Sequence, residues 1–118
     1  MQYMLLIYMD EQAMNREERE QCYAESTQFA HELKSNGQFL ACSPLQPVSM
    51  ATSVTVRDGK RLLTDGPFAE TREQLGGYFL IEARDLDAAI NIAARIPGAR
   101  VGTVEVRPVI EISGLPAE

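Results

Sequence analysis

The chain has little of several residue types on which common functional sites depend. Its 118 residues include no tryptophan, one histidine and two cysteines, and no apolar run approaches the roughly 20 residues that a membrane helix needs. A single histidine excludes a histidine-rich metal site. The two cysteines, Cys22 and Cys42, form no C-x-x-C pair of the zinc-ribbon or thioredoxin-like kind. We therefore expect no metal, no membrane partner and two free thiols.

Positive charge is also scarce. Eleven bases stand against seventeen acids, which gives a net charge of −6, and an acidic protein is a poor match for phosphate backbones. The segment Leu75-Gly76-Gly77 precedes an expected strand rather than a helix, so it is not a nucleotide-binding loop. We expect no nucleic-acid partner and no cofactor.

The length and the beginning of the chain bound its organisation. With 45% hydrophobic and 24% charged residues, the composition is typical of a folded protein. The size predicts one domain over residues 1–118, with a short tail at about 113–118. Residues 1–10 contain no basic leader and too short an apolar run for a signal peptide. We therefore expect a cytoplasmic protein.

Two helices are predicted by capping residues. Asn15 followed by Glu18 is typical of a capping box, which predicts a helix from there to about Asn36. Asp85 favours the start of a second helix that ends before Pro97. In the first helix, a narrow stripe is expected to face the core; it comprises Cys22, Ser26, Phe29 and Leu33.

Alternating or apolar segments predict six strands. Asp58-Gly59 is a strong hairpin signal between two of them, and a polar connection is expected through Gly76-Gly77. The expected strands are 2–9, 38–43, 52–57, 60–64, 78–83 and about 102–112.

The resulting order, β-α-β-(hairpin)-β-α-β, predicts an α+β ferredoxin-like sandwich. Two helices cover one face of such a sheet, yet strands 2–9 and 78–83 are apolar on both faces. An apolar sheet surface of that size needs a cover, and a second copy of the same sheet supplies one. We therefore expect a homodimer.

Residues 64–78, TDGPFAETREQLGGY, closely resemble the signature of the DGPF proteins, a branch of the YCII-related family. Further similarity lies at residues 3–8, 45–47 and 104–108. The resemblance implies a dimeric α/β barrel, a bacterial cytoplasmic setting and genetic association with extracytoplasmic-function sigma factors. Related barrels include lactone isomerases and cofactor-free monooxygenases, which favours a small-molecule function by analogy.

Two functions follow from the resemblance. The first is binding of a small molecule. In its catalytic version, the protein is a cofactor-independent enzyme that uses proton transfer. The alternative is a non-catalytic regulatory or interaction module that works with a sigma factor. Residues 10–36 carry seven acids and three bases, a surface suited either to solubility or to a basic partner.

Proteins of the wider YCII family are thought to use a histidine of the first helix paired with an aspartate. Alignment on the helix-terminating Gly37 places the matching position at about Ser26. His31 lies about 180° around the helix from Cys22, on the face expected to be solvated. The resemblance therefore does not predict a histidine–aspartate pair in this chain.

The candidate site residues come from the signature and from the strands. Asp65 is a candidate general base or polar anchor, although Asp-Gly-Pro is also ordinary turn chemistry. Glu105 and Arg107 share the polar face of the last strand, either as an interface salt bridge or with Arg107 as an anion contact. Three further residues are expected to line a pocket: Tyr8, Ser26 and Glu82.

Overall fold

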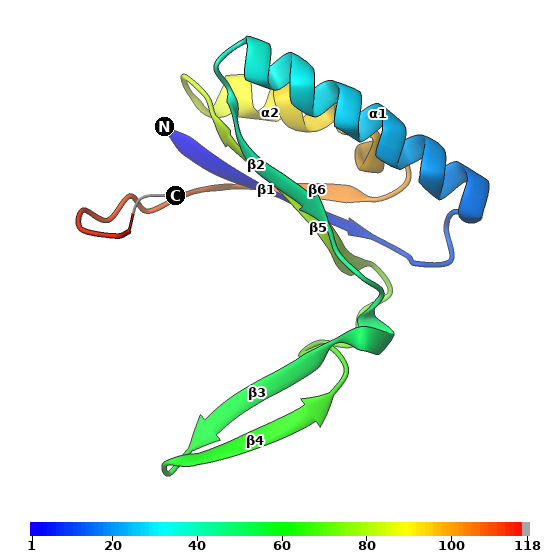
Figure 1. Ribbon diagram of the computed structural model, residues 1–118, viewed down its shortest axis with the longest axis vertical. Helices are drawn as coiled ribbons and strands as arrows, with labels where there is room; N and C mark the ends of the chain where they lie inside the picture. Colours follow the sequence, from blue (N-terminus) through cyan, green and yellow to red (C-terminus); the bar gives the residue numbers. More distant parts are fainter. Residues whose placement is uncertain (117–118) are drawn as a thin grey trace.

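The computed structural model describes residues 1–116, and Figure 1 labels its elements. They are β1 (Gln2–Met9), α1 (Arg16–Ser35), β2 (Phe39–Pro44), the 3₁₀ helix η1 (Val48–Met50), β3 (Thr52–Arg57), β4 (Lys60–Asp65), β5 (Gln74–Glu82), α2 (Leu86–Ala94), the 3₁₀ helix η2 (Pro97–Arg100) and β6 (Thr103–Pro108).

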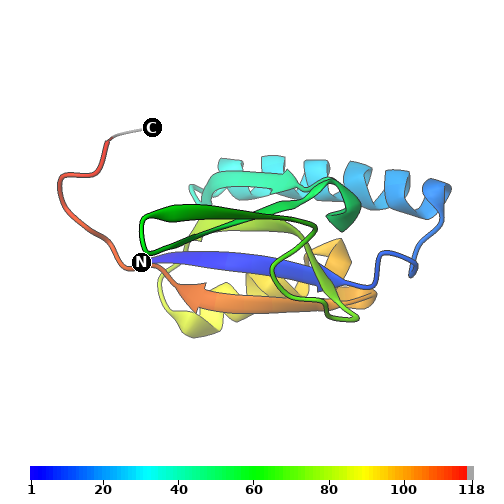
Figure 2. The same ribbon diagram turned by 90° about the horizontal axis from the view of Figure 1, so that it is seen from below.

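Four of the strands form an antiparallel sheet in the order β2-β5-β1-β6. Both helices pack on the same face of this sheet, and Figure 2 shows them behind it. The two central strands, β1 and β5, are those whose sequences are apolar on both faces. The predicted ferredoxin-like α+β sandwich is therefore confirmed. Within the described part of the chain, no helix is long and apolar enough to cross a membrane.

The core lies between the helices and the sheet. Phe29 of α1 and Phe79 of β5 meet there with ring centroids 6.0 Å apart. Leu33 is 1% exposed, and the other two residues of the predicted stripe, Cys22 and Ser26, are partly buried. The stripe prediction is thus confirmed, and His31 is exposed on the outer side of α1, as expected.

Local hydrogen bonds explain where the helices begin. The Asn15 side chain accepts from the backbone N–H of Glu18 at 2.8 Å, while the Glu18 carboxylate accepts from the N–H of Asn15 at 3.0 Å. This is the predicted capping box. Asp85 caps α2 by accepting from the N–H of Ala88 at 2.9 Å, and this bond lowers the pKa of the Asp85 carboxyl. After α1, Gly37 takes a φ of 73°, which favours glycine.

The expected polar connection through Gly76-Gly77 is wrong, because both glycines lie inside β5, which starts at Gln74 rather than at residue 78. The early part of β5 pairs with the end of β1. At Gly77, a Cβ atom would lie 3.0 Å from the carbonyl oxygen of Ser43 in β2. Glycine at this position therefore permits the close approach of two strands rather than forming a loop.

The last strand is shorter than predicted. It ends at Pro108 rather than at about residue 112. Pro108 pairs with Tyr3, and β1 starts at Gln2, so the sheet offers no partner strand further along. Residues 109–116 contain neither helix nor strand. The end of the expected tail, residues 117–118, lies outside the described residues.

The hairpin β3–β4 projects away from the sandwich as an arm (Figure 1). Asp58 and Gly59 form its tip with positive φ values of 50° and 75°, which confirms the turn prediction. Four apolar side chains of the arm are more than half exposed: Val54, Val56, Leu62 and Leu63. The arm gives the molecule extents of 46 × 43 × 23 Å.

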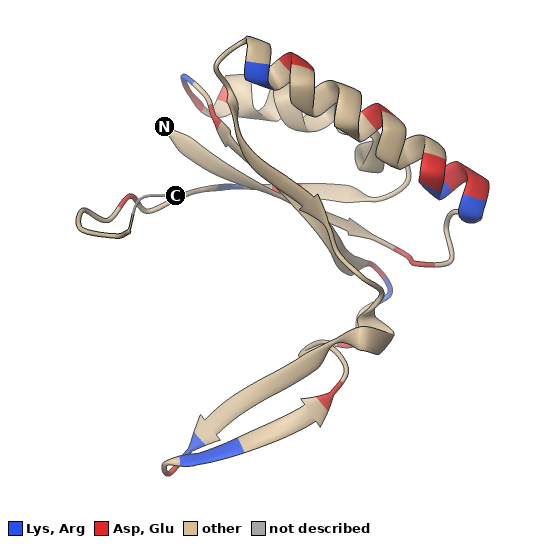
Figure 3. Ribbon diagram, viewed as in Figure 1, with Lys and Arg blue, Asp and Glu red and all other residues tan. Residues whose placement is uncertain are grey.

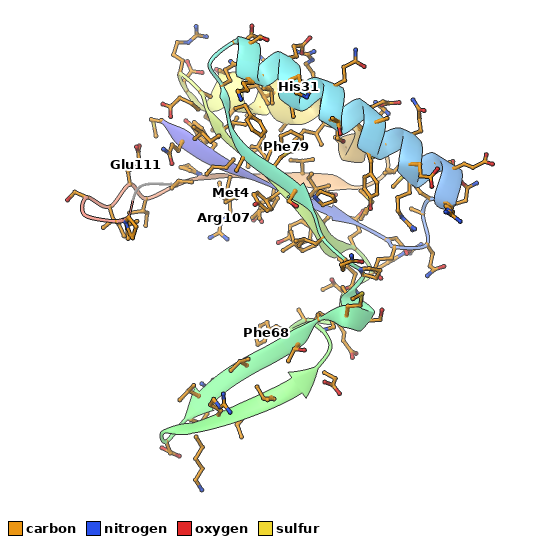
Figure 4. The ribbon with its side chains drawn as sticks, viewed as in Figure 1. Met4, His31, Phe68, Phe79, Arg107 and Glu111 are labelled. Carbon is orange, nitrogen blue, oxygen red and sulfur yellow. The ribbon has the colours of Figure 1, made fainter. Side chains whose placement is uncertain are left out.

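On the second face of the sheet, which we call the open face, residues 1–116 place no helix. In Figure 4, Phe79 points toward the helices, whereas Met4 and Arg107 point to the opposite side. Met4 pairs with both Leu80 and Arg107 across the sheet. Alternation along β1 and β5 places Leu6 and Tyr78 on the same face.

Candidate functional site

A cleft of about 440 Å³ opens where the end of β1, the first half of α1 and the segment after β2 meet. Its apolar wall includes Met9, Met14, Tyr23 and Leu45. Besides the phenol of Tyr23, its ionisable side chains are Asp10, Glu11, Arg19 and Cys22.

A smaller cavity of about 120 Å³ adjoins the cleft between α1 and the sheet. The cleft and the cavity share Met9, Cys22 and Tyr23 among their lining residues. Ser26 and Cys42 lie in the cavity wall. The family-matched position on the first helix therefore borders a hollow, although it carries a hydroxyl group instead of an imidazole.

Both cysteines of the cavity are free thiols, as predicted. Burial raises the pKa of Cys22 and of Cys42. A hydrogen bond from Ser26 to Cys22 opposes this rise in pKa, but its effect is smaller than that of burial. Since the thiolate is the reactive form, both side chains are poor nucleophiles at neutral pH.

The carboxylates of the cleft are held by neighbouring groups. Glu11 Oε2 accepts from the N–H of Val48 at 2.9 Å. Asp10 accepts from the N–H of Gln12 at 2.9 Å and lies 3.7 Å from Nε of Arg72. These contacts connect the loop between β1 and α1 with the segments before β3 and before β5. Within residues 1–116, no group of three or more metal-ligating side chains is present.

The structure divides the sequence-predicted site residues between the two sides of the sheet. Ser26 lies on the helix side, in the cavity wall. Tyr8, Glu105 and Arg107 lie on the open face, where Glu105 pairs with Leu6 and Arg107 with Met4. The sheet therefore separates Ser26 from the other residues.

Glu82 also lies on the open face, at the end of the sheet where the N-terminus lies. Its side chain is 47% exposed, and Oε1 accepts a hydrogen bond from the amino group of Met1 at 2.7 Å. The burial that made this carboxylate a candidate is not present in the protomer. Within the described residues, neither Glu105 nor Arg107 forms an ion pair.

Asp65 ends β4 at the base of the arm and is exposed. The bonds that hold the turn come from its neighbours. The N–H of Gly66 donates to the carbonyl of Ala51 at 2.7 Å, and the Ser53 hydroxyl donates to the carbonyl of Gly66 at 2.8 Å. Beyond this turn, a hollow of about 700 Å³ lies between Tyr8 of the open face and Phe68, which is 93% exposed.

Sequence reasoning missed the cleft. Arg19 and Tyr23 of α1 meet Leu45, which follows β2, only in the folded chain. No motif joins these residues, and the spacing along α1 gives Arg19 the pattern of an ordinary surface residue. Only the partly buried state of Arg19 distinguishes it, and burial is a tertiary property.

The acids of α1 are spread along the helix, while bases gather at the tip of the arm (Figure 3). Two of these acids form ion pairs with residues outside α1. Glu25 lies 2.6 Å from Nη2 of Arg100, and Glu32 forms an ion pair with Arg95. The acidic surface is therefore partly used to join α1 to the segment around η2.

The chain matches the family model of the YCII-related domain over residues 1–113. A relative, "Uncharacterized protein R00369" of Rhizobium meliloti (strain 1021), is 34% identical over 113 residues, which cover 92% of this chain and 91% of the relative. A solved structure of 5-chloro-2-hydroxyhydroquinone dehydrochlorinase (TftG) from Burkholderia phenoliruptrix AC1100, in complex with 2,5-dihydroxybenzoquinone, is similar with a TM-score of 0.56. That match has 12% identity and covers 93% of this chain and 94% of the other, so it shows a shared fold. The chain belongs to the YCII-related family.

Proposed function

We propose that this protein binds a small organic molecule in the cleft beside α1. The observation that carries the proposal is a concave site of about 440 Å³ with an apolar wall and a few polar groups. Small-molecule sites have this size and this balance of surfaces. The complex of TftG with 2,5-dihydroxybenzoquinone supports the proposal, since that protein of the same fold holds a compact ring compound.

The chemistry available in the cleft favours proton transfer over nucleophilic attack. Burial raises the pKa of Cys22, which keeps its thiol protonated. The groups suited to moving a proton are the carboxylates of Asp10 and Glu11, which line the cleft. A catalytic form of the proposal is thus a cofactor-independent reaction in which one of them acts as general base.

We also propose that the working unit is a cytoplasmic homodimer. An isolated two-stranded hairpin is marginal in water, yet the arm exposes Val54 and Leu63 by 60% and 62%. The open face adds apolar groups that no helix covers. A second copy that packs on the open face and the arm would shield both surfaces. The two free thiols are compatible with a reducing compartment.

Such a dimer makes the open face a second candidate site. Glu105 and Arg107 lie there without an ion-pair partner in the described protomer, beside the apolar side chains of Met4 and Leu6. In this version of the proposal, Arg107 is the anion contact, Asp65 is a base or anchor, and Tyr8 and Glu82 line the site. The sigma-factor alternative gains less support, because part of the acidic surface of α1 is paired within the chain.

Amide chemical shifts of the full chain, recorded during titration with a panel of small phenols and aromatic acids, locate the site. Binding in the cleft moves the signals of Met9, Cys22 and Tyr23. Shifts confined to Glu105 and Arg107 would transfer the site to the open face, and no shift at either place would contradict the proposal.

A matched pair of variants on α1 supplies the control for this titration. Cys22→Phe fills the cleft and is expected to abolish binding, whereas Gln28→Phe places the same ring on the exposed side of α1 and should leave binding unchanged. Thermal melts establish that both variants fold. Should Cys22→Phe not fold, the mapped shifts of the wild-type chain still decide between the two sites.

A further inference from the structure

We propose that the cleft selects compact anionic molecules, of the size and charge of an aromatic monocarboxylate, and that Arg19 is the group that binds their charge. This inference deepens the proposed function and rests on it. It concerns the helix side of the sheet and is independent of Arg107 on the open face.

Arg19 is distinguished by what it does not bind. It lies near the start of α1, partly buried, in the wall of the cleft. Its Nη2 atom donates to the backbone carbonyl of Glu11 at 3.3 Å, and among residues 1–116 no carboxylate lies within 4.0 Å of its guanidinium group. A guanidinium group has five N–H donors in a planar fork that matches a carboxylate.

The other arginines of the helical layer behave differently. Arg16 pairs with Glu20, Arg95 with Glu32, and Arg100 with Glu25. These pairs are on the surface and satisfy the cations locally. Arg19 alone among the arginines of α1 lines the cleft, so it is the cation that a ligand in the cleft meets.

The two acids of the cleft do not remove this preference. Asp10 is engaged by Arg72 and by the N–H of Gln12, and Glu11 is engaged by the N–H of Val48. Asp10 and Glu11 contribute two negative formal charges. Arg19 and Arg72, the latter outside the wall, contribute two positive ones. The cleft is therefore balanced before a ligand arrives, and the cation without a carboxylate partner is available to a new anion.

The apolar wall defines the rest of the ligand. Met9, Met14, Tyr23 and Leu45 surround the same space, and thioether and aromatic groups pack well against a flat ring. A carboxylate directed at Arg19 leaves such a ring against this wall. A phenolate with one ionised oxygen would make the same contact with fewer hydrogen bonds.

The test compares three probes of nearly equal shape on the full-length protein: benzoate, benzamide and benzylamine. They are anionic, neutral and cationic near neutral pH. Binding is measured by calorimetry and by the amide shifts of Cys22 and Tyr23. We expect benzoate to bind most tightly, and Arg19→Gln to weaken benzoate about tenfold or more, as for loss of a charge-assisted hydrogen bond. Arg16→Gln, whose parent side chain is 90% exposed, is the matched control and should not change binding.

The outcomes separate this inference from the proposed function. If benzamide or benzylamine binds in the cleft as tightly as benzoate, or if Arg19→Gln leaves benzoate binding unchanged, the charge preference is wrong while the small-molecule cleft remains. If none of the probes and no member of the phenol and acid panel moves the cleft signals, both the inference and the proposed function fail. Benzoate shifts centred on Arg107 would also overturn the assignment to Arg19.

Discussion

The carboxylate of Glu25, in the middle of α1, lies 2.6 Å from Nη2 of Arg100, the last residue of η2. About two turns further along α1, on the same side, Glu32 pairs with Arg95, whose guanidinium group stacks 4.7 Å from the ring centre of Phe29. Two ion pairs thus join the long helix to the segment that follows α2. They add to the contacts between α1 and η2.

Glu25 should make stability depend on pH. The hydrogen bond from Arg100 holds the pKa of Glu25 below its usual value. A carboxyl with a lowered folded-state pKa contributes stability above its unfolded pKa, and this contribution is lost as the pH falls through the folded value. We expect Glu25→Gln to lose less stability than the wild type between neutral and acidic pH, as measured by urea unfolding at each pH.

Glu17→Gln is the control for that series. Glu17 is exposed on the same helix and forms no ion pair within residues 1–116. Its variant should follow the pH profile of the wild type, apart from the general effect of one negative charge. Equal profiles for both variants would show that the contact with Arg100 contributes nothing beyond net charge.

Gly77 should not tolerate a methyl group. A Cβ atom there would lie 3.0 Å from the carbonyl oxygen of Ser43 and 3.2 Å from Cα of Pro44. Both are backbone atoms of β2, so neither can move aside as a flexible side chain would. Overpacking of this kind costs about 1–3 kcal/mol. We expect Gly77→Ala to lower the free energy of unfolding by that amount in denaturant titrations.

The adjacent Gly76 provides the comparison. The atoms nearest to a Cβ atom built at Gly76 are 3.9 Å away, which is an ordinary van der Waals contact. Gly76→Ala is expected to be neutral or slightly stabilising, because alanine loses less backbone entropy on folding. A large loss of stability in this variant as well would mean that the whole β5 segment, rather than the approach to β2, requires glycine.

The proposed homodimer predicts the effect of a charge on the arm. Val54 and Leu63 are cross-strand partners on the exposed arm. The wild-type chain should sediment as a dimer at micromolar concentration, and Leu63→Asp should sediment as a monomer. Ile90→Glu, which changes an exposed apolar residue of α2 on the helix side, should remain dimeric. A monomeric wild type would contradict the proposal.

Ser26 should influence the reactivity of Cys22. The Ser26 hydrogen bond lowers the pKa of Cys22 against the stronger effect of burial. Removing it in Ser26→Ala should raise that pKa further, so alkylation of Cys22 by iodoacetamide should become slower at a given pH. Cys42 provides the internal standard, since only burial shifts its pKa. Faster alkylation of Cys22 in the variant would show that Ser26 mainly shields the thiol.

Much of the fold was predictable because its signals are local. The capping box of Asn15 and Glu18 and the turn at Asp58-Gly59 lie where expected, since both depend on side chains a few residues apart. The errors occurred where a strand's limits depend on its partner. The role of Gly77 follows from the nearness of β2, and the end of β6 at Pro108 follows from the start of β1.

The sequence by itself determined the order of elements, the two-sided apolar character of β1 and β5, and membership of a family. These properties follow from hydrophobic period, capping and turn chemistry, which act over short distances along the chain. Only the tertiary structure decided which side of the sheet each polar residue occupies. It placed Ser26 on the helix side of the sheet and Tyr8 and Arg107 on the open face. It also brought Arg19 into a cleft with segments that are distant in the sequence. Burial and the absence of an ion-pair partner arise from packing between distant segments, and no local pattern encodes them.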